Sequence, residues 1–220
     1  MTAICGIGWV RGREWGGLRL RQAQQAAAGA DLALAWRDSG VFASPVRNFA
    51  RLNSAARLAC FAGALALRDA GETYASAEKT DTALLGTDDC GSLRANEEYF
   101  RDYVSCGRAL ARGALFVYTL PSSGLAEAAI HFGFQGPLLY MGGGRGSIAY
   151  LLQTAAAMIE EHETEAALVM SMSPAPAISF CLRRDPADGF LAPGAVAQCA
   201  CRAPDAESLL ASLQSLGESR

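Results

Sequence analysis

Apolar residues occur along the chain in two patterns of different length. Five short apolar runs have the length of buried strands: residues 2–10, 82–86, 138–141, 166–172 and 195–201. Five longer stretches have the length and composition of helices: residues 18–36, 54–70, 121–132, 146–161 and 205–216. We predict an α/β fold, a five-stranded mixed sheet with helices on both faces. Because no helix separates the last two strands, one of them is expected to run antiparallel.

Local signals define the ends of one helix and leave a long segment without regular structure. Asn53 or Ser54 can cap the helix that runs to Ala70, and Gly71 ends it. Residues 88–113 are polar and irregular, so a long loop is expected there. In a compact domain such a loop either has a function or covers a surface.

The composition narrows the class of protein. The chain has 220 residues, 51% of them hydrophobic, which is enough for the core of a single domain over residues 1–220. Its net charge of −3 gives no general attraction to nucleic acid or anionic lipid. No uninterrupted stretch of about 18 apolar residues could span a membrane. Residues 1–9 lack the positive start and the length of a signal peptide.

The cysteines indicate a reducing compartment. Their number, seven, is odd, and none forms a Cys-x-x-Cys pair, so neither a disulfide framework nor a metal site is expected. A cytoplasmic protein fits this pattern. Cys199 and Cys201 stand two apart on the expected strand 195–201 and are interpreted as small core residues that share a face.

The densest cluster of glycines joins the strand at 138–141 to the next helix. This glycine turn consists of Gly142, Gly143, Gly144, Arg145 and Gly146. Backbone N–H groups at such a helix start can bind an anion or an oxyanion. The turn matches neither Gly-x-Gly-x-x-Gly nor the Gly-Lys-Ser/Thr end of a phosphate-binding loop, so neither nucleotide motif is present.

Nucleophiles and bases are few around the glycine turn. A nucleophile elbow needs Cys or Ser at its tip, whereas Ser147 lies just inside the helix. His131 lies on an apolar helix and is expected to be half-buried, and His162 lies in an acidic run and is expected to be solvated. No Ser–His or Cys–His pair is therefore predicted.

Two features near the turn need a partner or a cover. Arg145 places a cation in the first turn of a helix, where it opposes the helix dipole, so it either meets a carboxylate or phosphate or is a surface arginine. The helix at 146–161 has almost no polar face, so it is expected to be buried all round. One sheet covers one side of it, and something else must cover the other.

Four stretches, taken in order, resemble the N-terminal half of a β-ketoacyl synthase, which has the thiolase fold. They are residues 47–71, 85–100, 116–137 and 184–203. They resemble, in turn, the family's first long helix, its second strand with the following loop, the segment before the active-site strand, and the loop into the closing strand. The resemblance implies that the whole chain is one thiolase-like half.

The resemblance also implies that three catalytic elements of the family are missing. Counting from the Gly-Pro pair at 136–137, Arg145 stands where the family has its nucleophilic cysteine. The family's Gly-Glu-Gly reads Pro-Gly-Ala at residues 193–195, so its acid is absent. The two catalytic histidines belong to a second half that these residues do not include. The family contains chain-length factors, which lack the cysteine, pair with an active ketosynthase and shape its product tunnel.

The resemblance to short chain-length factors of polyketide and aryl-polyene type pathways implies a partner surface. In the family the strand before the elbow pairs with its counterpart across the dimer, and here this strand consists of Leu138, Leu139, Tyr140 and Met141. It and the glycine turn are expected to face a β-ketoacyl synthase, with acyl carrier protein as an indirect partner. This partner, a second copy or the helix at 205–216 is expected to cover the helix at 146–161.

Three hypotheses of function follow. The main one is a catalytically inactive chain-length-factor-like subunit that shapes the acyl-chain pocket of a ketosynthase in polyketide or fatty-acid type biosynthesis, without a cofactor. The first alternative is an acyltransferase or hydrolase that uses Ser147, Cys90 or Cys106 as its nucleophile. The second is a domain that binds coenzyme A or a nucleotide at the glycine turn.

Overall fold

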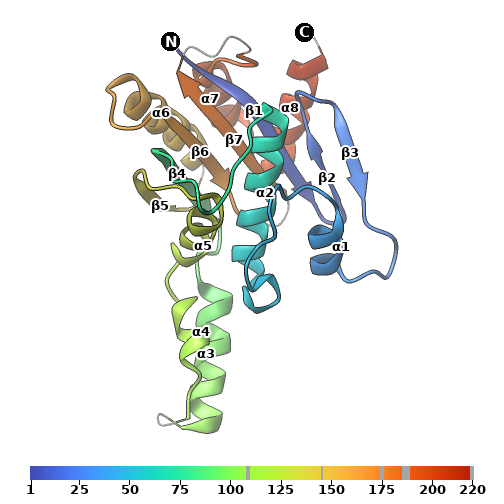
Figure 1. The fold of residues 1–220 in the computed structure, drawn as a ribbon, viewed down its shortest axis with the longest axis vertical. Helices are drawn as coiled ribbons and strands as arrows, with labels where there is room; N and C mark the ends of the chain where they lie inside the picture. The colour runs from blue at the N-terminus through green and yellow to red at the C-terminus, as the bar shows by residue number, and fades with distance from the viewer. Residues whose placement is uncertain (108–109, 145, 174–175, 185–188, 219–220) are drawn as a thin grey trace.

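The computed structural model describes residues 1–107, 110–144, 146–173, 176–184 and 189–218. The strands are β1 (Thr2–Arg11), β2 (Glu14–Gly17), β3 (Gln22–Gln25), β4 (Thr82–Asp88), β5 (Leu138–Gly142), β6 (Ala166–Ser171) and β7 (Ala177–Arg184). The helices are α1 (Leu32–Asp38), α2 (Ser54–Ala70), α3 (Leu93–Cys106), α4 (Gly113–Val117), α5 (Ser123–Phe132), α6 (Ser147–Glu160), α7 (Pro193–Arg202) and α8 (Ala206–Glu218), with a 3₁₀ turn at Phe49–Arg51. Figure 1 shows one sheet between two layers of helices, with α3 and α4 projecting from this body.

The strands form one mixed sheet in the order β3-β2-β1-β7-β6-β4-β5. The β4 strand pairs in parallel with both β5 and β6, and the other neighbouring strands are antiparallel. Consequently β3 and β5 are the two edge strands, and they lie at opposite ends of the sheet (Figure 1).

Each face of the sheet has its own hydrophobic core. Along β6, Leu168 and Met170 belong to the core under α2 and α5, whereas Ala167 and Val169 belong to the core under α6, α7 and α8. This alternation follows from the period of two in a strand, which turns successive side chains to opposite faces. A strand buried on both faces therefore appears in the sequence as a continuous apolar run.

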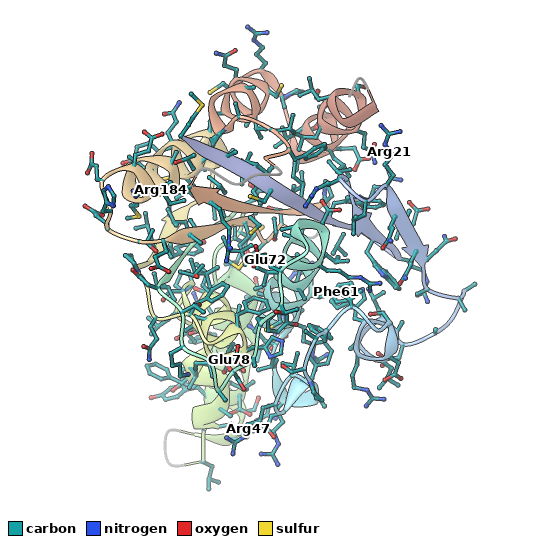
Figure 2. All side chains as sticks on the ribbon, turned by 45° about the horizontal axis from the view of Figure 1, so that its top comes forward. Arg21, Arg47, Phe61, Glu72, Glu78 and Arg184 are labelled. Atoms are coloured by element: carbon teal, nitrogen blue, oxygen red, sulfur yellow. The ribbon has the colours of Figure 1, made fainter. Side chains whose placement is uncertain are left out.

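The capped helix predicted from the sequence is confirmed as α2. Asn53 caps it by accepting a hydrogen bond from the N–H of Ala56 at 2.8 Å, and Gly71 follows its last residue. At its centre lies Phe61, which is fully buried (Figure 2). The Phe61 ring stacks on Trp36 with 5.1 Å between ring centroids and meets Trp15 edge-on at 5.4 Å. Through these ring contacts α1 and β2 pack against α2.

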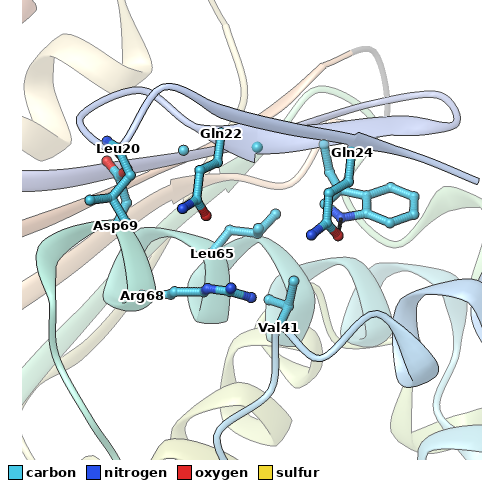
Figure 3. A pocket seen from close by; sticks show the side chains of 10 residues that line it. Leu20, Gln22, Gln24, Val41, Leu65, Arg68 and Asp69 are labelled. Atoms are coloured by element: carbon cyan, nitrogen blue, oxygen red, sulfur yellow. Dashed lines mark hydrogen bonds between the residues drawn. The ribbon is translucent and has the colours of Figure 1, made fainter.

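A buried carboxylate holds the end of α2 to the sheet. Asp69, which is 1% exposed, accepts hydrogen bonds from the backbone N–H groups of Ile7 at 2.8 Å, Leu20 at 2.9 Å and Arg19 at 3.0 Å. Burial raises the pKa of this carboxyl, and the three donors oppose the rise. Figure 3 shows a pocket beside it, lined in part by Leu65, between α2 and the β2–β3 hairpin. The pocket is distant from β5, since the hairpin forms the opposite edge of the sheet.

The helix predicted at residues 18–36 is wrong. The segment begins with the turn of the β2–β3 hairpin and β3, continues without regular structure over residues 26–31, and is helical only from Leu32. The hairpin adds to the edge of β1, from Gly8 opposite Gly17 to Arg11 opposite Glu14. Its pairing with β1, together with the bonds of the distant Asp69 to the turn, outweighs the helix propensity of the alanines.

The strand predicted at residues 195–201 is also wrong. This segment is α7, which begins at Pro193, a residue favoured at a first helical position. Cys199 and Cys201 therefore do not share a strand face; Cys199 is half-buried and Cys201 is exposed. The antiparallel partner of β6 is instead β7, which the sequence prediction omitted. With β2 and β3 added as well, the sheet has seven strands rather than five, and the α/β class holds.

The loop predicted at residues 88–113 is largely helical. Leu93–Cys106 forms α3, which lies alongside α4 (Figure 1). Neither helix contains a buried residue, so the pattern of one buried face that identifies most helices is absent.

The predicted cover for the helix at 146–161 comes from within the chain. The helix α7 packs on α6, and Leu209, Leu210 and Leu213 of α8 complete the same core. The side of α6 away from the sheet is only partly covered, since Tyr150 remains 57% exposed. The expectation that α6 is buried all round is therefore wrong, and of the three covers expected for it the helix at 205–216 contributes, together with α7. None of the helices in the described parts of the chain has the length and hydrophobicity needed to cross a membrane.

Candidate functional site

The glycine turn lies where three parallel strands end. The strands β4, β5 and β6 point the same way, and the turn leads from the end of β5 into α6. A Cβ on Gly143 would stand 2.2 Å from the backbone oxygen of Asp88, so only glycine lets the turn lie against β4. Gly146 has φ 88°, a left-handed conformation, immediately before α6. Gly142 and Gly144 complete the described part of the turn, and Arg145 lies outside the described residues.

The candidate serine is not paired with a histidine. Ser147 is buried, and its hydroxyl donates to the backbone oxygen of Gly142 at 3.4 Å. His131 lies on α5, against the other face of the sheet, with its Nε2 3.2 Å from the hydroxyl of Tyr74. Burial lowers the pKa of His131 to about 4. His162 follows the far end of α6, about 22 Å away at about 1.5 Å per helical residue.

The two candidate cysteines are exposed and separate. Cys90 lies just after β4, and its backbone N–H donates to Asp88 Oδ1 at 2.8 Å. Cys106 is the last residue of α3. In the described part of the chain neither thiol has a hydrogen bond to a base. No group of three His, Cys, Asp or Glu side chains there could hold a metal ion.

Two carboxylates lie beside the start of the turn, on the β4 side. Asp88 is the register partner of Gly142, and Asp89 accepts a hydrogen bond from the hydroxyl of Ser173 at 2.6 Å. Burial, and then the charges of Asp88 and Asp89, raise the pKa of Tyr140. Burial likewise raises the pKa of Asp88. Negative charge at this place opposes the binding of a phosphate or of coenzyme A at the turn.

The strand β5 has a free edge. On one side β5 pairs with β4, and within the described residues nothing pairs with its other side. The N–H of Leu84 donates to the oxygen of Pro137 at 2.8 Å. Continuing this parallel ladder turns the backbone N–H and C=O groups of Leu138, Tyr140 and Gly142 to the free edge. The side chain of Leu138 is 41% exposed beside them.

Solved structures share much of this fold. The ishigamide ketosynthase/chain length factor aligns with 84% of the chain and 63% of its own at a TM-score of 0.59 and 18% identity. The complex of the ketosynthase ApeO with its chain length factor ApeC, from Xenorhabdus doucetiae, contains a chain that aligns with 84% of this chain and 80% of its own. The TM-score is 0.53 and the identity 14%. AntDE:AntF, a type II PKS acyl-carrier protein in complex with its ketosynthase, aligns with 84% of the chain and 58% of its own, with a TM-score of 0.57 and 11% identity.

The chain has a ketosynthase-type fold. The predicted resemblance to the β-ketoacyl synthases is confirmed at the level of the fold, which by itself does not determine function. The chain spans 63% of the aligned chain in the first of these structures and 58% in the third. It spans 80% of the aligned chain in the ApeO–ApeC complex. Neither a protein-family model nor a curated protein sequence matches it.

Sequence reasoning missed one feature near the glycine turn. Leu93, Phe100 and Val104 are exposed and lie on one stripe of α3, which begins close after β4. Their spacing of seven and then four residues is a helical signal. It was hidden because polar residues between them made the segment resemble a loop.

Proposed function

We propose that the chain is a chain-length-factor-like subunit, pairing through β5 with a β-ketoacyl synthase and bounding its acyl-chain pocket. The observation that carries this proposal is the unpaired edge of β5 beside the glycine turn. An exposed strand edge is a template for another strand, and a chain that keeps one next to its central turn has a place for a partner.

Chemical features of the turn support a role other than catalysis. The sequence has Arg145 where the resemblance implies the nucleophilic cysteine. The described hydroxyl nearest in sequence, that of Ser147, is bonded to a backbone oxygen instead of a base. Solved complexes with this fold include a ketosynthase with its chain length factor and a ketosynthase with an acyl-carrier protein. Polyketide or fatty-acid type biosynthesis is therefore the proposed setting, and the cytoplasm, where free thiols persist, the proposed location.

A proline at the free edge tests strand pairing directly. Leu138→Pro removes an N–H that points to the partner, and it leaves every β4–β5 bond available. We expect the variant to fold as the parent does and to bind its ketosynthase at least tenfold more weakly. The measurement is co-expression with ketosynthases of the source organism, one at a time, followed by size exclusion with light scattering and a titration of the pair that forms.

Leu138→Val is the matched control, because it shortens the same side chain and keeps the N–H. It is expected to bind nearly as well as the parent chain. If Leu138→Pro and Leu138→Val bind equally, β5 does not pair across the interface. If the parent chain stays monomeric with every ketosynthase, the proposed function is wrong.

The alternative acyltransferase or hydrolase makes a different prediction for the isolated chain. Incubated with acetyl-coenzyme A and longer acyl thioesters, the chain is expected to gain no acyl mass at Ser147, since its hydroxyl is buried and donates to a backbone oxygen instead of to a base. Intact-mass spectrometry checks this, with Cys90→Ser and Cys106→Ser variants to account for exchange at exposed thiols. An acyl adduct that Ser147→Ala abolishes would support the acyltransferase.

A further inference from the structure

The two helices α3 and α4 form an arm with an uncovered apolar surface. Eight large hydrophobic side chains among the described residues of the arm and just after it are exposed: Leu93, Phe100, Tyr103, Val104, Leu110, Phe116, Val117 and Leu120. Phe100 and Val104 are each 65% exposed. Such a concentration of exposed apolar side chains marks an interaction site in a folded protein.

The arm is a defined structure that its own residues hold together. Arg112 is bound to Asp102 twice, through its backbone N–H and its Nε, both at 2.8 Å. The rings of Tyr99 and Phe116 lie 5.3 Å apart, which joins α3 to α4. A 14-residue helix with no buried residue has little intrinsic stability in water. The contacts with α4 stabilise the inner side of α3, and a partner that covers the outer side would stabilise the helix further.

Both ends of the arm connect to elements next to β5. A Cβ on Gly91, two residues before α3, would stand 3.5 Å from the hydroxyl of Tyr140 on β5. After α4, the hydroxyl of Tyr118 donates to Glu127 of α5 at 3.4 Å. A chain that pairs with the free edge of β5 therefore has the base of the arm within its reach.

The area that a stable complex needs decides what covers the arm. A stable interface takes roughly 20–30 residues from each partner, whereas β5 offers five. The outer sides of α3, which has 14 residues, and of α4, which has five, add to this number and raise it towards that range. The edge of β5 can set the register in which the two chains pair. It does not offer the apolar area of the few side chains that provide most of the binding energy in an interface.

We infer that the arm is the main docking surface for the ketosynthase subunit that pairs with β5, with Phe100 and Val104 in its centre. This inference rests on the proposed function. It adds that most of the affinity comes from α3, while β5 orients the pair. The partner must then present an apolar groove beside its own edge strand.

Single serine substitutions on the arm test this inference. Phe100→Ser and Val104→Ser are each expected to weaken binding to the ketosynthase at least tenfold, which is the effect of losing a hot spot. Leu34→Ser on α1 is the matched control, because Leu34 is 49% exposed and belongs to an element remote from β5. Binding is measured by titration with the purified ketosynthase. Circular dichroism and thermal unfolding check that each variant is folded.

The outcomes separate the two proposals. If the parent chain binds a ketosynthase and the arm variants bind as well as Leu34→Ser, the inference about the arm fails and the proposed function stands. If the chain alone forms a dimer that Phe100→Ser dissociates, the arm binds a second copy instead, and the inference is overturned. If no ketosynthase binds and the chain stays monomeric, both proposals fail.

Discussion

Asp69→Ala is expected to lower the free energy of unfolding by about 3 to 5 kcal/mol. The carboxylate accepts three backbone N–H bonds, from Ile7, Arg19 and Leu20, and alanine accepts none. A buried donor left without a partner costs about 1–3 kcal/mol, and Ile7 is fully buried while the other two are less so. Because a domain is stable by only about 5–15 kcal/mol, the loss is a large part of the total. Urea unfolding at neutral pH, followed by circular dichroism, measures it.

Two variants test whether the hydrogen bonds carry this effect. Asp69→Asn keeps the shape and one acceptor oxygen, so it is expected to retain one or two of the three bonds and to lose less stability than Asp69→Ala. Arg68→Ala removes the neighbouring side chain, whose single observed bond is to the oxygen of Gly40 at 3.1 Å, and is expected to change stability by less than about 1 kcal/mol. If Asp69→Ala unfolds at the same urea concentration as Arg68→Ala, the three bonds do not stabilise the fold.

The elements that were predicted correctly have their signals within one stretch of sequence. The α2 helix has a capping asparagine at one end and Gly71 at the other, and the chain ahead of α6 goes from an apolar strand through glycines into an apolar helix. In both cases the residues that set the structure are neighbours in the chain. Such signals can be recognised without knowledge of the tertiary fold.

The elements that were predicted wrongly depend on partners far away in sequence. The turn of the β2–β3 hairpin is held by Asp69, about 50 residues later, and β7 lies between β1 and β6. An alanine-rich segment has helix propensity wherever it occurs, and here the bonds from Asp69, added to the pairing with β1, favour the hairpin. For α7 a local helix signal, Pro193, was present, but the short apolar run after it has the length of a buried strand.

The elements of the candidate site were predicted from the sequence, and their role as a site stays a prediction. The apolar strand at 138–141 and the glycine turn that leads from it into a helix are present in the structure. The sequence could not show that β5 is an edge strand, since this follows from the order of all seven strands. Nor could it show that the segment after β4 is a pair of helices whose apolar residues face outwards.

His131→Phe is expected to make the protein resist mild acid better than the parent chain. Burial lowers the pKa of His131 to about 4 in the folded state, whereas an unfolded histidine titrates near 6.5. Between these values the unfolded chain binds a proton that the folded chain does not, so stability falls as the pH falls from about 6.5 to 4. At about 1.4 kcal/mol per pH unit the loss reaches up to about 3 kcal/mol. Phenylalanine does not titrate, so this part of the loss should disappear.

The packing around His131 makes phenylalanine a suitable replacement. The ring lies 5.1 Å from that of Tyr74, 5.6 Å from Phe42 and 5.0 Å from Phe132, and the Tyr74 hydroxyl keeps the N–H of Ala43 as a partner. Urea unfolding at pH 7.0, 5.5 and 4.5 gives the change in stability for parent and variant. The exposed His162, replaced by Gln, serves as the control and is expected to keep the acid loss of the parent. An equal loss in His131→Phe and in the parent would mean that His131 is already protonated in the folded state at pH 5.5, and that burial does not keep it neutral.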